Sequence, residues 1–345
     1  RVGGRTLAAQ RIPVIIDQRP HASVAKAEVG DPLRMLAVFS LPDGAGALNL
    51  RRERHELTRL VQQIAKVNNR AIDLRVLQYG ATRQRLGDAL VEQPGWDVVH
   101  LSGHGLAGGL LLEDDAGEHD LVSSTDLVEL LDLGADRIKL VTLSACESAA
   151  VTARQHLQLL GLAGDHDDRP SRDLGGDPDP APQATGPVLP AVAAELVSRL
   201  DCAVLAMRYP VVDDFAIALA DSFYDLTLGK GQPVPRALGL SLSRPGTAPR
   251  PADAPGAPTL SLVTPALFGA RAATLTLTPP PGGRPVFALE GRKLAEFPSQ
   301  PERFVGRVGM LTRAGTALAP QSGRPGVLLH GMAGAGKTAC ALELA

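Results

Sequence analysis

The stretch that decides the fold is WDVVHLSGHG, residues 96–105, in which an apolar run ends at a histidine followed by a glycine. A short, nearly continuous apolar run of this kind predicts a buried strand of a parallel sheet, here over residues 96–103. The stretch IKLVTLSACES, residues 138–148, has the same form and predicts a second strand over 138–144. Functional groups of such sheets lie just past the carboxyl ends of strands. We therefore expect His104 and Cys146 to face one cleft at one edge of the sheet.

The flanking segments alternate between strand and helix patterns. Apolar runs predict further strands at residues 34–40, 72–78 and 202–207, and shorter ones at 14–16 and 260–268. Apolar residues that recur every three or four positions predict helices at 53–67, 82–91, 125–133, 188–200, 213–228 and 236–243. This alternation predicts an α/β fold with a mostly parallel central sheet and helices on both faces.

Composition excludes several classes of function. The 345 residues have a formal net charge of -2 and only 3% aromatic side chains, so neither nucleic acid nor an anionic membrane is expected as a partner. No run of about eighteen apolar residues occurs, so no membrane span is expected. The chain opens without an apolar signal segment, which favours the cytoplasm.

The chain has three cysteines, Cys146, Cys202 and Cys340. An odd and small number in a chain of this length is not typical of a disulfide framework. The cysteines and histidines do not have the spacing of a zinc site, so no metal is expected.

His104 and Cys146 together could form a nucleophilic pair, with Cys146 as the thiol and His104 as its base. A peptidase thiol needs a group that takes its proton and donors that hold the oxyanion. Gly105 follows the histidine, and we expect the backbone N–H groups of Gly105 and Cys146 to be those donors. Each residue also has a simpler interpretation, because a single cysteine is usually a small buried hydrophobe and a single histidine is usually structural. No third member of a triad is evident, so a backbone carbonyl could orient the imidazole.

Several segments, in order, resemble the CHAT family of caspase-like cysteine peptidases. They are PLRMLAVFS (32–40), HLSGHG (100–105), LSACES (143–148), AMRYPVVDDFAIALADSFYDLTLGKG (206–231) and PALFG (265–269). The resemblance implies a caspase-like three-layer α/β/α sandwich over residues 32–270, after an N-terminal extension at 1–31. It also implies that His104 is the base, that Cys146 is the nucleophile, and that the substrate is a protein or peptide.

The chain departs from the family pattern in two places. Tyr209 stands where the family often has Trp, which is a mild change. The segment 164–186, rich in Asp, Pro and Gly, predicts a disordered loop. The corresponding region of caspases is a processing linker, so cleavage after Arg169 or Arg172 is one hypothesis. A tolerated surface insertion is the alternative.

Asp213 and Asp214 follow the RYP segment, where related enzymes have an acidic pocket residue. The resemblance therefore implies a pocket for a basic residue before the scissile bond, with arginine favoured because a carboxylate binds it bidentately. The alternative is that Asp213 caps the following helix, since Asp is a favoured N-cap residue.

The last residues match a phosphate-binding loop, in which backbone N–H groups and a helix N-terminus hold phosphate. An apolar run at 327–329 predicts the strand before it, and residues 339–344 predict the helix after it. We expect ATP and Mg²⁺ to bind there in a full-length protein, through Gly331, Gly334, Gly336, Lys337 and Thr338.

The segment PERFVGRVGML (301–311) resembles the one that precedes this loop in STAND-type signalling NTPases, although an ordinary start of a helix is the alternative. We expect a linker over 271–300 and the truncated start of an NTPase domain over 301–345. The chain lacks an initial Met and ends seven residues after Thr338, so we expect it to be a piece of a larger protein, which could oligomerise through its NTPase region.

Two functions remain open at this point. The first is a cysteine endopeptidase, an effector in bacterial defence or programmed death that an NTPase module gates. The second is a non-catalytic caspase-like interaction module of a signalling NTPase. The presence of both His104 and Cys146 favours the enzyme.

Overall fold

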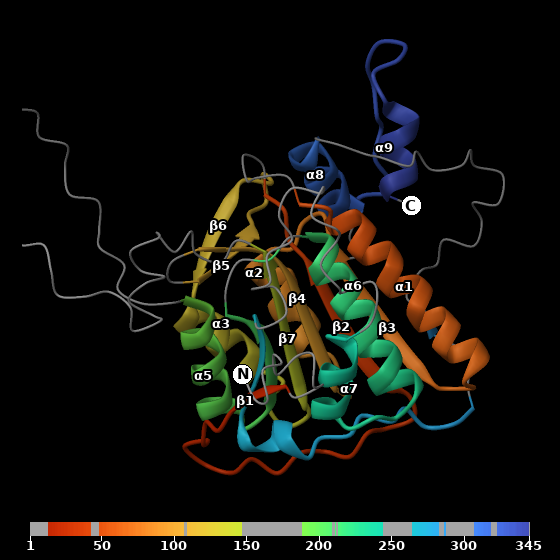
Figure 1. The fold of residues 1–345 in the computed structure, drawn as a ribbon. Helices are drawn as coiled ribbons and strands as arrows, with labels where there is room; N and C mark the ends of the chain where they lie inside the picture. Colours follow the sequence, from red (N-terminus) through yellow and green to blue (C-terminus); the bar gives the residue numbers. More distant parts are fainter. Residues whose placement is uncertain are drawn as a thin grey trace, which may run out of the picture.

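The computed structural model describes residues 13–42, 48–106, 109–146, 188–208, 211, 213–243, 264–282, 286–287, 307–318 and 323–344. Figure 1 shows a central sheet flanked by helices, with the C-terminal helices at one end of it. None of the described helices is both long and apolar enough to cross a membrane.

The central sheet confirms the expected fold class. Its strand order is β1-β9-β8-β7-β4-β2-β3-β10. Neighbouring strands are parallel throughout, except that β8 and β9 are antiparallel. The bounds are β1 Val14–Ile16, β2 Leu33–Phe39, β3 Ile72–Gln78, β4 Val98–Leu106, β7 Leu140–Cys146, β8 Ala203–Met207, β9 Pro265–Phe268 and β10 Val286–Phe287.

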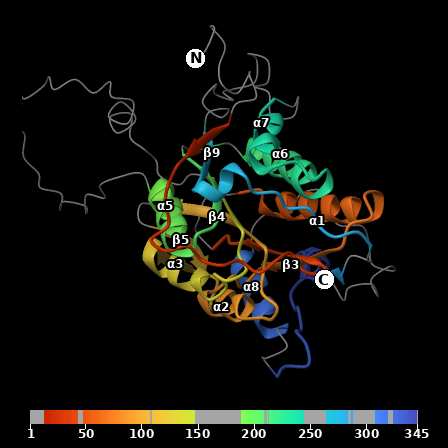
Figure 2. The same cartoon turned by 90° about the horizontal axis from the view of Figure 1, so that it is seen from below.

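Helices cover both faces of this sheet, which makes the three layers. Figure 2 shows α1, α6 and α7 on one side of the sheet and α2, α3 and α5 on the other. The bounds are α1 Leu50–Val67, α2 Arg83–Leu90, α3 Ser124–Asp132, α5 Val188–Leu200, α6 Asp213–Tyr224 and α7 Val234–Ser241. In α1 the buried residues Leu57, Leu60, Val61 and Ile64 follow the predicted helical periodicity.

Strands β4 and β7 are longer than the sequence predicts. The prediction ended them at residues 103 and 144, whereas they continue through Leu106 and Cys146. The extension of β4 is paired with β5 (Gly109–Glu113), which forms a hairpin with β6 (His119–Ser123). This hairpin was not predicted. The expectation that His104 and Cys146 follow their strands is therefore wrong, because both lie in the last residues of the strands.

Three further segments differ from expectation. The helix predicted over 213–228 ends at Tyr224, and a π-helical turn, Asp225–Gly229, continues it. The expected linker contains β10, which pairs with β3, and part of the expected N-terminal extension forms β1 in the sheet. The strand predicted at 327–329 is absent: these residues have no regular structure, and Leu328 is 85% exposed.

Several predictions concern residues outside the described part of the chain. These are the 164–186 loop with Arg169 and Arg172, and Tyr209.

The C-terminal helices lie at the carboxyl edge of the sheet (Figure 1). They are α8, Val308–Leu318, and α9, Lys337–Leu344. In α8, Thr312 Oγ1 donates a hydrogen bond to Glu113 Oε2 at 2.8 Å. Glu113 also accepts hydrogen bonds from the backbone N–H groups of Leu41 and Gly80, which follow β2 and β3. One buried carboxylate thus connects α8 with the ends of three strands.

Candidate active site

His104 and Cys146 are direct neighbours across the sheet. Strands β4 and β7 are parallel, and their register pairs His104 with Cys146 at the carboxyl ends of both. Paired strands lie about 4.8 Å apart, so the backbones of the two residues lie side by side. The structure therefore brings together the two residues that the sequence predicts as base and nucleophile.

The surroundings of His104 restrict its access to solvent. Its exposed fraction is only 6%, and the adjacent Gly105 is buried and pairs with Leu110 of β5. Gly105, a predicted oxyanion donor, is thus held within the sheet next to the histidine.

Gly103 explains part of the SGHG pattern. A Cβ atom at this position would lie 2.7 Å from the carbonyl oxygen of Ser40, a distance that real Cβ atoms do not adopt. The backbone of β4 approaches the end of β2 too closely for any side chain here. The glycine therefore permits the close pairing of β2 and β4 immediately before His104.

A buried polar cluster lies directly behind the predicted dyad, and sequence analysis did not identify it. Glu53 of α1 is 4% exposed, and its carboxylate accepts a hydrogen bond from Ser102 Oγ at 2.6 Å. Ser144 Oγ donates to the same carboxylate at 3.1 Å, and His100 Nε2 lies 3.2 Å from it. The signal that could have revealed this cluster is the position of Glu53 on the apolar face of its helix, because Leu57 and Leu60 follow it four and seven residues later.

The cluster extends to α6 through Tyr224. The other ring nitrogen of His100, Nδ1, lies 3.1 Å from the Tyr224 hydroxyl, which donates to Thr142 Oγ1 at 3.0 Å. Burial raises the pKa of Tyr224, so its phenol keeps its proton. His100 is fully buried inside β4, in agreement with the prediction that it belongs to the strand.

The predicted pocket residues contact the start of α1. Asp213 Oδ2 accepts a hydrogen bond from the backbone N–H of Asn49 at 2.8 Å. Asp214 forms an ion pair with Arg52 at 2.6 Å, with both side chains more than half exposed. Both carboxylates thus join the N-terminal ends of α1 and α6. In parallel α/β units these helix ends lie at the carboxyl edge of the sheet.

The other two cysteines are poor candidates for a nucleophile. Burial raises the pKa of the Cys202 thiol to about 12. Cys340 is also buried, and burial raises the pKa of its thiol as well. Because the thiolate is the reactive form, burial disfavours nucleophilic chemistry at both thiols.

The predicted phosphate-binding loop has three glycines with positive φ angles and a helix after it, but the strand expected before it is absent. Gly331, Gly334 and Gly336 have φ angles of 149°, 76° and 77°, and α9 begins at Lys337 as the motif predicts. Lys337 Nζ donates hydrogen bonds to the carbonyl oxygens of Gly331 and Met332 at 3.0 and 2.9 Å. These residues fit a phosphate group.

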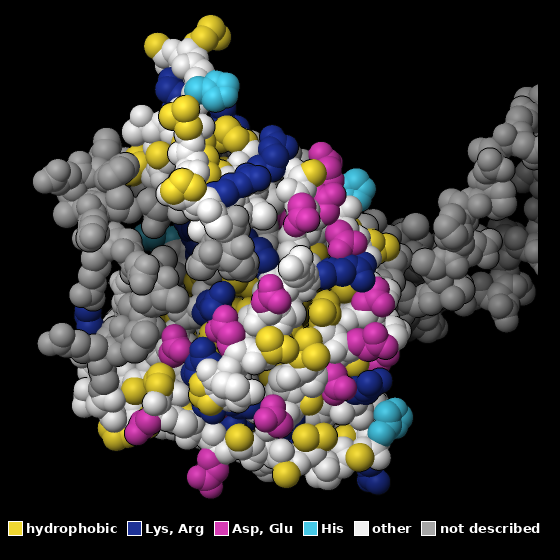
Figure 3. Space-filling model, turned by 180° about the vertical axis from the view of Figure 1, so that it is seen from behind, with side chains coloured by type: hydrophobic (Ala, Val, Ile, Leu, Met, Phe, Trp, Pro, Cys, Tyr) yellow, Lys and Arg dark blue, Asp and Glu magenta, His cyan; other side chains and the backbone are white. Residues whose placement is uncertain are grey.

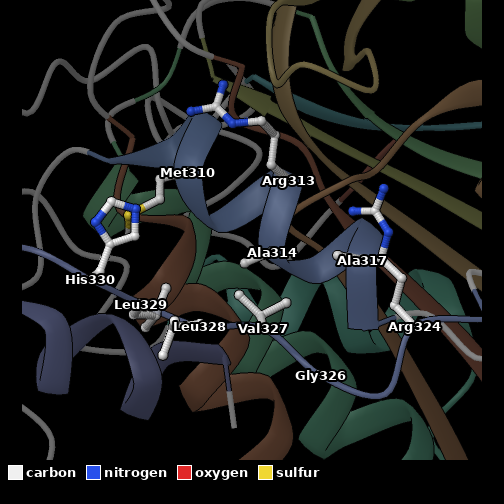
Figure 4. A pocket seen from close by; sticks show the side chains of 10 residues that line it. All are labelled: Met310, Arg313, Ala314, Ala317, Arg324, Gly326, Val327, Leu328, Leu329 and His330. Atoms are coloured by element: carbon white, nitrogen blue, oxygen red, sulfur yellow. The ribbon is translucent and has the colours of Figure 1, made fainter.

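A pocket of about 390 Å³ adjoins this loop (Figure 4). It lies between α8 and residues 324–330, and none of the predicted catalytic residues lines it. The lining residues are Met310, Arg313, Ala314, Ala317, Arg324, Gly326, Val327, Leu328, Leu329 and His330.

Within the described ranges, no group of three or more His, Cys, Asp and Glu side chains is arranged to hold a metal ion. Figure 3 shows basic and acidic side chains interspersed over the described part of the face seen from behind.

Comparison with known protein families finds a similarity in the part of the chain around the predicted dyad. Residues 6–165 match the family model of the CHAT domain. Over these residues the chain is similar to the CHAT domain. The CHAT match includes both His104 and Cys146, begins within the predicted N-terminal extension, and stops before Asp213 and before the phosphate-binding loop.

A solved structure described as "structure of pro-sf-caspase-1" resembles this chain. Its TM-score is 0.37 and its sequence identity is 13%, and the similarity covers 71% of this chain and 90% of that chain. A comparison with curated proteins finds no match.

Proposed function

We propose that this protein is a cysteine endopeptidase that cleaves protein substrates with a Cys146–His104 dyad. The observation that supports this most is the pairing of the two residues in register at the carboxyl ends of adjacent parallel strands. The CHAT match covers both residues, and its family contains cysteine peptidases.

The reaction that this arrangement supports has two halves. His104 takes the proton of the Cys146 thiol, and the thiolate attacks the scissile carbonyl carbon. The tetrahedral oxyanion then accepts hydrogen bonds from the backbone N–H groups of Gly105 and Cys146. His104 returns the proton to the leaving amine, and a water molecule hydrolyses the thioester with His104 again as base.

Asp213 and Asp214 are our candidates for binding a basic residue before the scissile bond. Both lie at the start of α6, and Asp214 is the more exposed of the two. A substrate guanidinium would take the place that Arg52 occupies beside Asp214, since both offer the same planar donors.

We further propose that the phosphate-binding loop belongs to a module that controls the peptidase, in an effector of bacterial defence or programmed death. The conformation of the three glycines and the position of Lys337 at the start of α9 support nucleotide binding. Lys337 would contact the outer phosphates of ATP, and Thr338 would hold Mg²⁺.

A thiol-reactive peptide probe that ends in arginine tests the peptidase. We expect wild-type protein to be labelled at Cys146, as located by peptide mass mapping, and Cys146→Ala and His104→Ala to remain unlabelled. Labelling at Cys202 or Cys340 would show that the nucleophile is wrongly assigned. Equal labelling of wild type and His104→Ala would favour the alternative, a non-catalytic interaction module.

A further inference from the structure

The buried carboxylate of Glu53 contacts Ser102 and Ser144, the residues two positions before His104 and Cys146 in their strands. The register of β4 and β7 pairs His100 with Thr142, then Ser102 with Ser144, and then His104 with Cys146. Alternate residues of a strand belong to the same face of a sheet, so these pairs occupy successive positions of one face. Figure 2 shows α1 and α6 together on one side of the sheet. Polar groups of the first two pairs meet a carboxylate that α1 supplies.

This carboxylate connects the two strands that hold the dyad. Ser102 Oγ, from β4, donates to Glu53 Oε2, and Ser144 Oγ, from β7, donates to Glu53 Oε1. Ser102 Oγ also lies 3.1 Å from the carbonyl oxygen of Ser144, so the strands are linked directly as well. The last pair, His104 and Cys146, follows two residues later, about 6.6 Å along the strands.

A glutamate is the residue that this environment requires. Hydroxyl groups of Ser102 and Ser144 and the Nε2 atom of His100 converge on its two oxygens. Buried polar groups must be paired, and a carboxylate is the side chain that only accepts hydrogen bonds. A glutamine would present an NH₂ group to one of the two hydroxyl donors, Ser102 or Ser144, which hydrogen-bond to different oxygens of Glu53. A purely apolar residue would leave all of them without this acceptor.

We propose that Glu53 is a positioning residue for the Cys146–His104 dyad, acting through Ser102, Ser144 and His100. The inference rests on the proposed peptidase function. Glu53 does not contact the substrate; it holds the ends of β4 and β7 in the register that brings the thiol and the imidazole together. A misplacement of about 1 Å can cost on the order of a hundredfold in rate. A change at Glu53, two strand residues before the dyad, is therefore expected to lower the reactivity of the Cys146 thiol.

The test measures the reactivity of the thiol without a peptide substrate. The full chain is treated with iodoacetamide, and the rate of alkylation at Cys146 is followed by peptide mass mapping in wild type, Glu53→Gln and His104→Ala. We expect Glu53→Gln to alkylate at least about tenfold more slowly than wild type, in line with the loss of a supporting hydrogen-bond partner. With a peptide substrate, kcat should fall while KM changes little.

A matched control separates positioning from stability. Asp97 is also a fully buried carboxylate, but it lies just before the other end of β4, where it pairs with Arg137 and Lys139. Asp97→Asn should lower the melting temperature and leave the alkylation rate of the folded protein within about twofold of wild type. Should Glu53→Gln fail to fold, Ser144→Ala replaces it and should slow alkylation about two- to fivefold, since it removes only one of the hydrogen bonds.

The outcomes are distinct. Slow alkylation of His104→Ala together with a wild-type rate in folded Glu53→Gln, or in Ser144→Ala as its replacement, would overturn the role of Glu53 and leave the peptidase proposal standing. Equal rates in wild type and His104→Ala would overturn the dyad, and with it any residue that positions the dyad. A slow Asp97→Asn variant would show that thiol reactivity follows stability alone, which would also overturn the role of Glu53.

Discussion

At the scale of single residues, burial makes Cys202 a poor candidate for the nucleophile that we propose at Cys146. Cys202 follows α5 and is enclosed by the core, where the ionised thiolate is disfavoured by desolvation. Cys146 lies at the carboxyl end of β7, paired with a histidine. The same side chain therefore acts as a core hydrophobe in one place and as a candidate nucleophile in the other.

The raised pKa of Cys202 predicts that the protein loses stability as pH rises in the alkaline range. In the unfolded chain this thiol ionises near its ordinary pKa of about 8.5, whereas in the folded protein it does so at about 12. Between these values the unfolded state has lost a proton that the folded state keeps, so stability falls as pH rises, by up to about 1.4 kcal/mol per pH unit. Denaturant unfolding from pH 8 to 11 should show a smaller fall for Cys202→Ala than for wild type. Parallel curves would contradict this assignment.

Asp214 tests the predicted preference for arginine. In a panel of otherwise identical peptides, Asp214→Asn should reduce the ratio of kcat/KM for arginine over a neutral residue about five- to thirtyfold, because an exposed charged hydrogen bond contributes roughly 1–2 kcal/mol. Arg52→Gln is the matched control, since it removes the ion pair and keeps the Asp214 carboxylate. An unchanged ratio in Asp214→Asn would remove this residue from the pocket.

At the scale of secondary-structure elements, the close approach of backbones decides where glycine is needed. Gly87 of α2 and Gly315 of α8 both lie inside helices, where glycine is intrinsically unfavourable. Their surroundings differ. A Cβ atom at residue 87 would lie 3.7 Å from Leu130 Cδ2, an ordinary contact, whereas one at residue 315 would lie 2.6 Å from the carbonyl oxygen of Tyr79.

Alanine substitutions at these two glycines should therefore have opposite effects. Gly87→Ala should stabilise the protein by about 0.5–1 kcal/mol, because it removes the entropic disadvantage of glycine in a helix. Gly315→Ala should destabilise it by about 1–3 kcal/mol, because α8 must move away from the end of β3. Chemical denaturation of both variants provides the measurement. Stabilisation by Gly315→Ala would mean that α8 does not pack against Tyr79 in solution.

At the scale of the whole molecule, the C-terminal helices join the α/β domain through buried carboxylates. Glu343 of α9 is 3% exposed, and its carboxylate is paired with Arg51 and Arg54 of α1 and accepts a hydrogen bond from the Tyr79 hydroxyl at 2.6 Å. Burial, together with the charge of Glu343, raises the pKa of Tyr79. Helix α1 thus contacts α9 through its arginines and the polar cluster behind the dyad through Glu53.

Replacing Glu343 should loosen α9 specifically. In Glu343→Gln, Arg51 and Arg54 lose their shared negative partner, at a cost of about 1.5–3 kcal/mol to the local structure. Amide hydrogen exchange over residues 337–344 should then accelerate roughly ten- to a hundredfold, while exchange in β4 and β7 stays unchanged. Glu129→Gln, on the exposed side of α3, is the control and should change neither. Unchanged exchange in α9 of Glu343→Gln would show that the carboxylate does not anchor this helix.

The sequence by itself was sufficient for the elements with strong periodicity. The apolar run at 72–78 and the helical pattern at 188–200 form β3 and α5, and most of the run predicted as a strand at 138–144 lies in β7. Alternation of such runs with helices also predicted the parallel sheet and its layers. Local pattern is enough in these cases because burial on both faces of a parallel sheet demands continuous apolar strands.

Weaker patterns failed where a distant partner decides the structure. The hairpin β5–β6 and the extension of β4 depend on pairing between segments, which a local apolar pattern does not encode. The run at 327–329 has strand-forming residues and no strand beside it among the described residues, so its backbone remains irregular. A strand needs a neighbour to pair with, and propensity alone does not supply one.

Part of the candidate site could likewise be predicted from the sequence, and part of it could not. His104, Gly105 and Cys146 could be chosen from the sequence, because residue type and position at strand ends already indicate nucleophilic chemistry. Their pairing in register and the buried Glu53 behind them were decided only by tertiary structure, since α1, β4 and β7 are far apart in the chain. Chemistry is a property of side chains and is visible in a sequence, whereas distance is a property of packing and appears only in the fold.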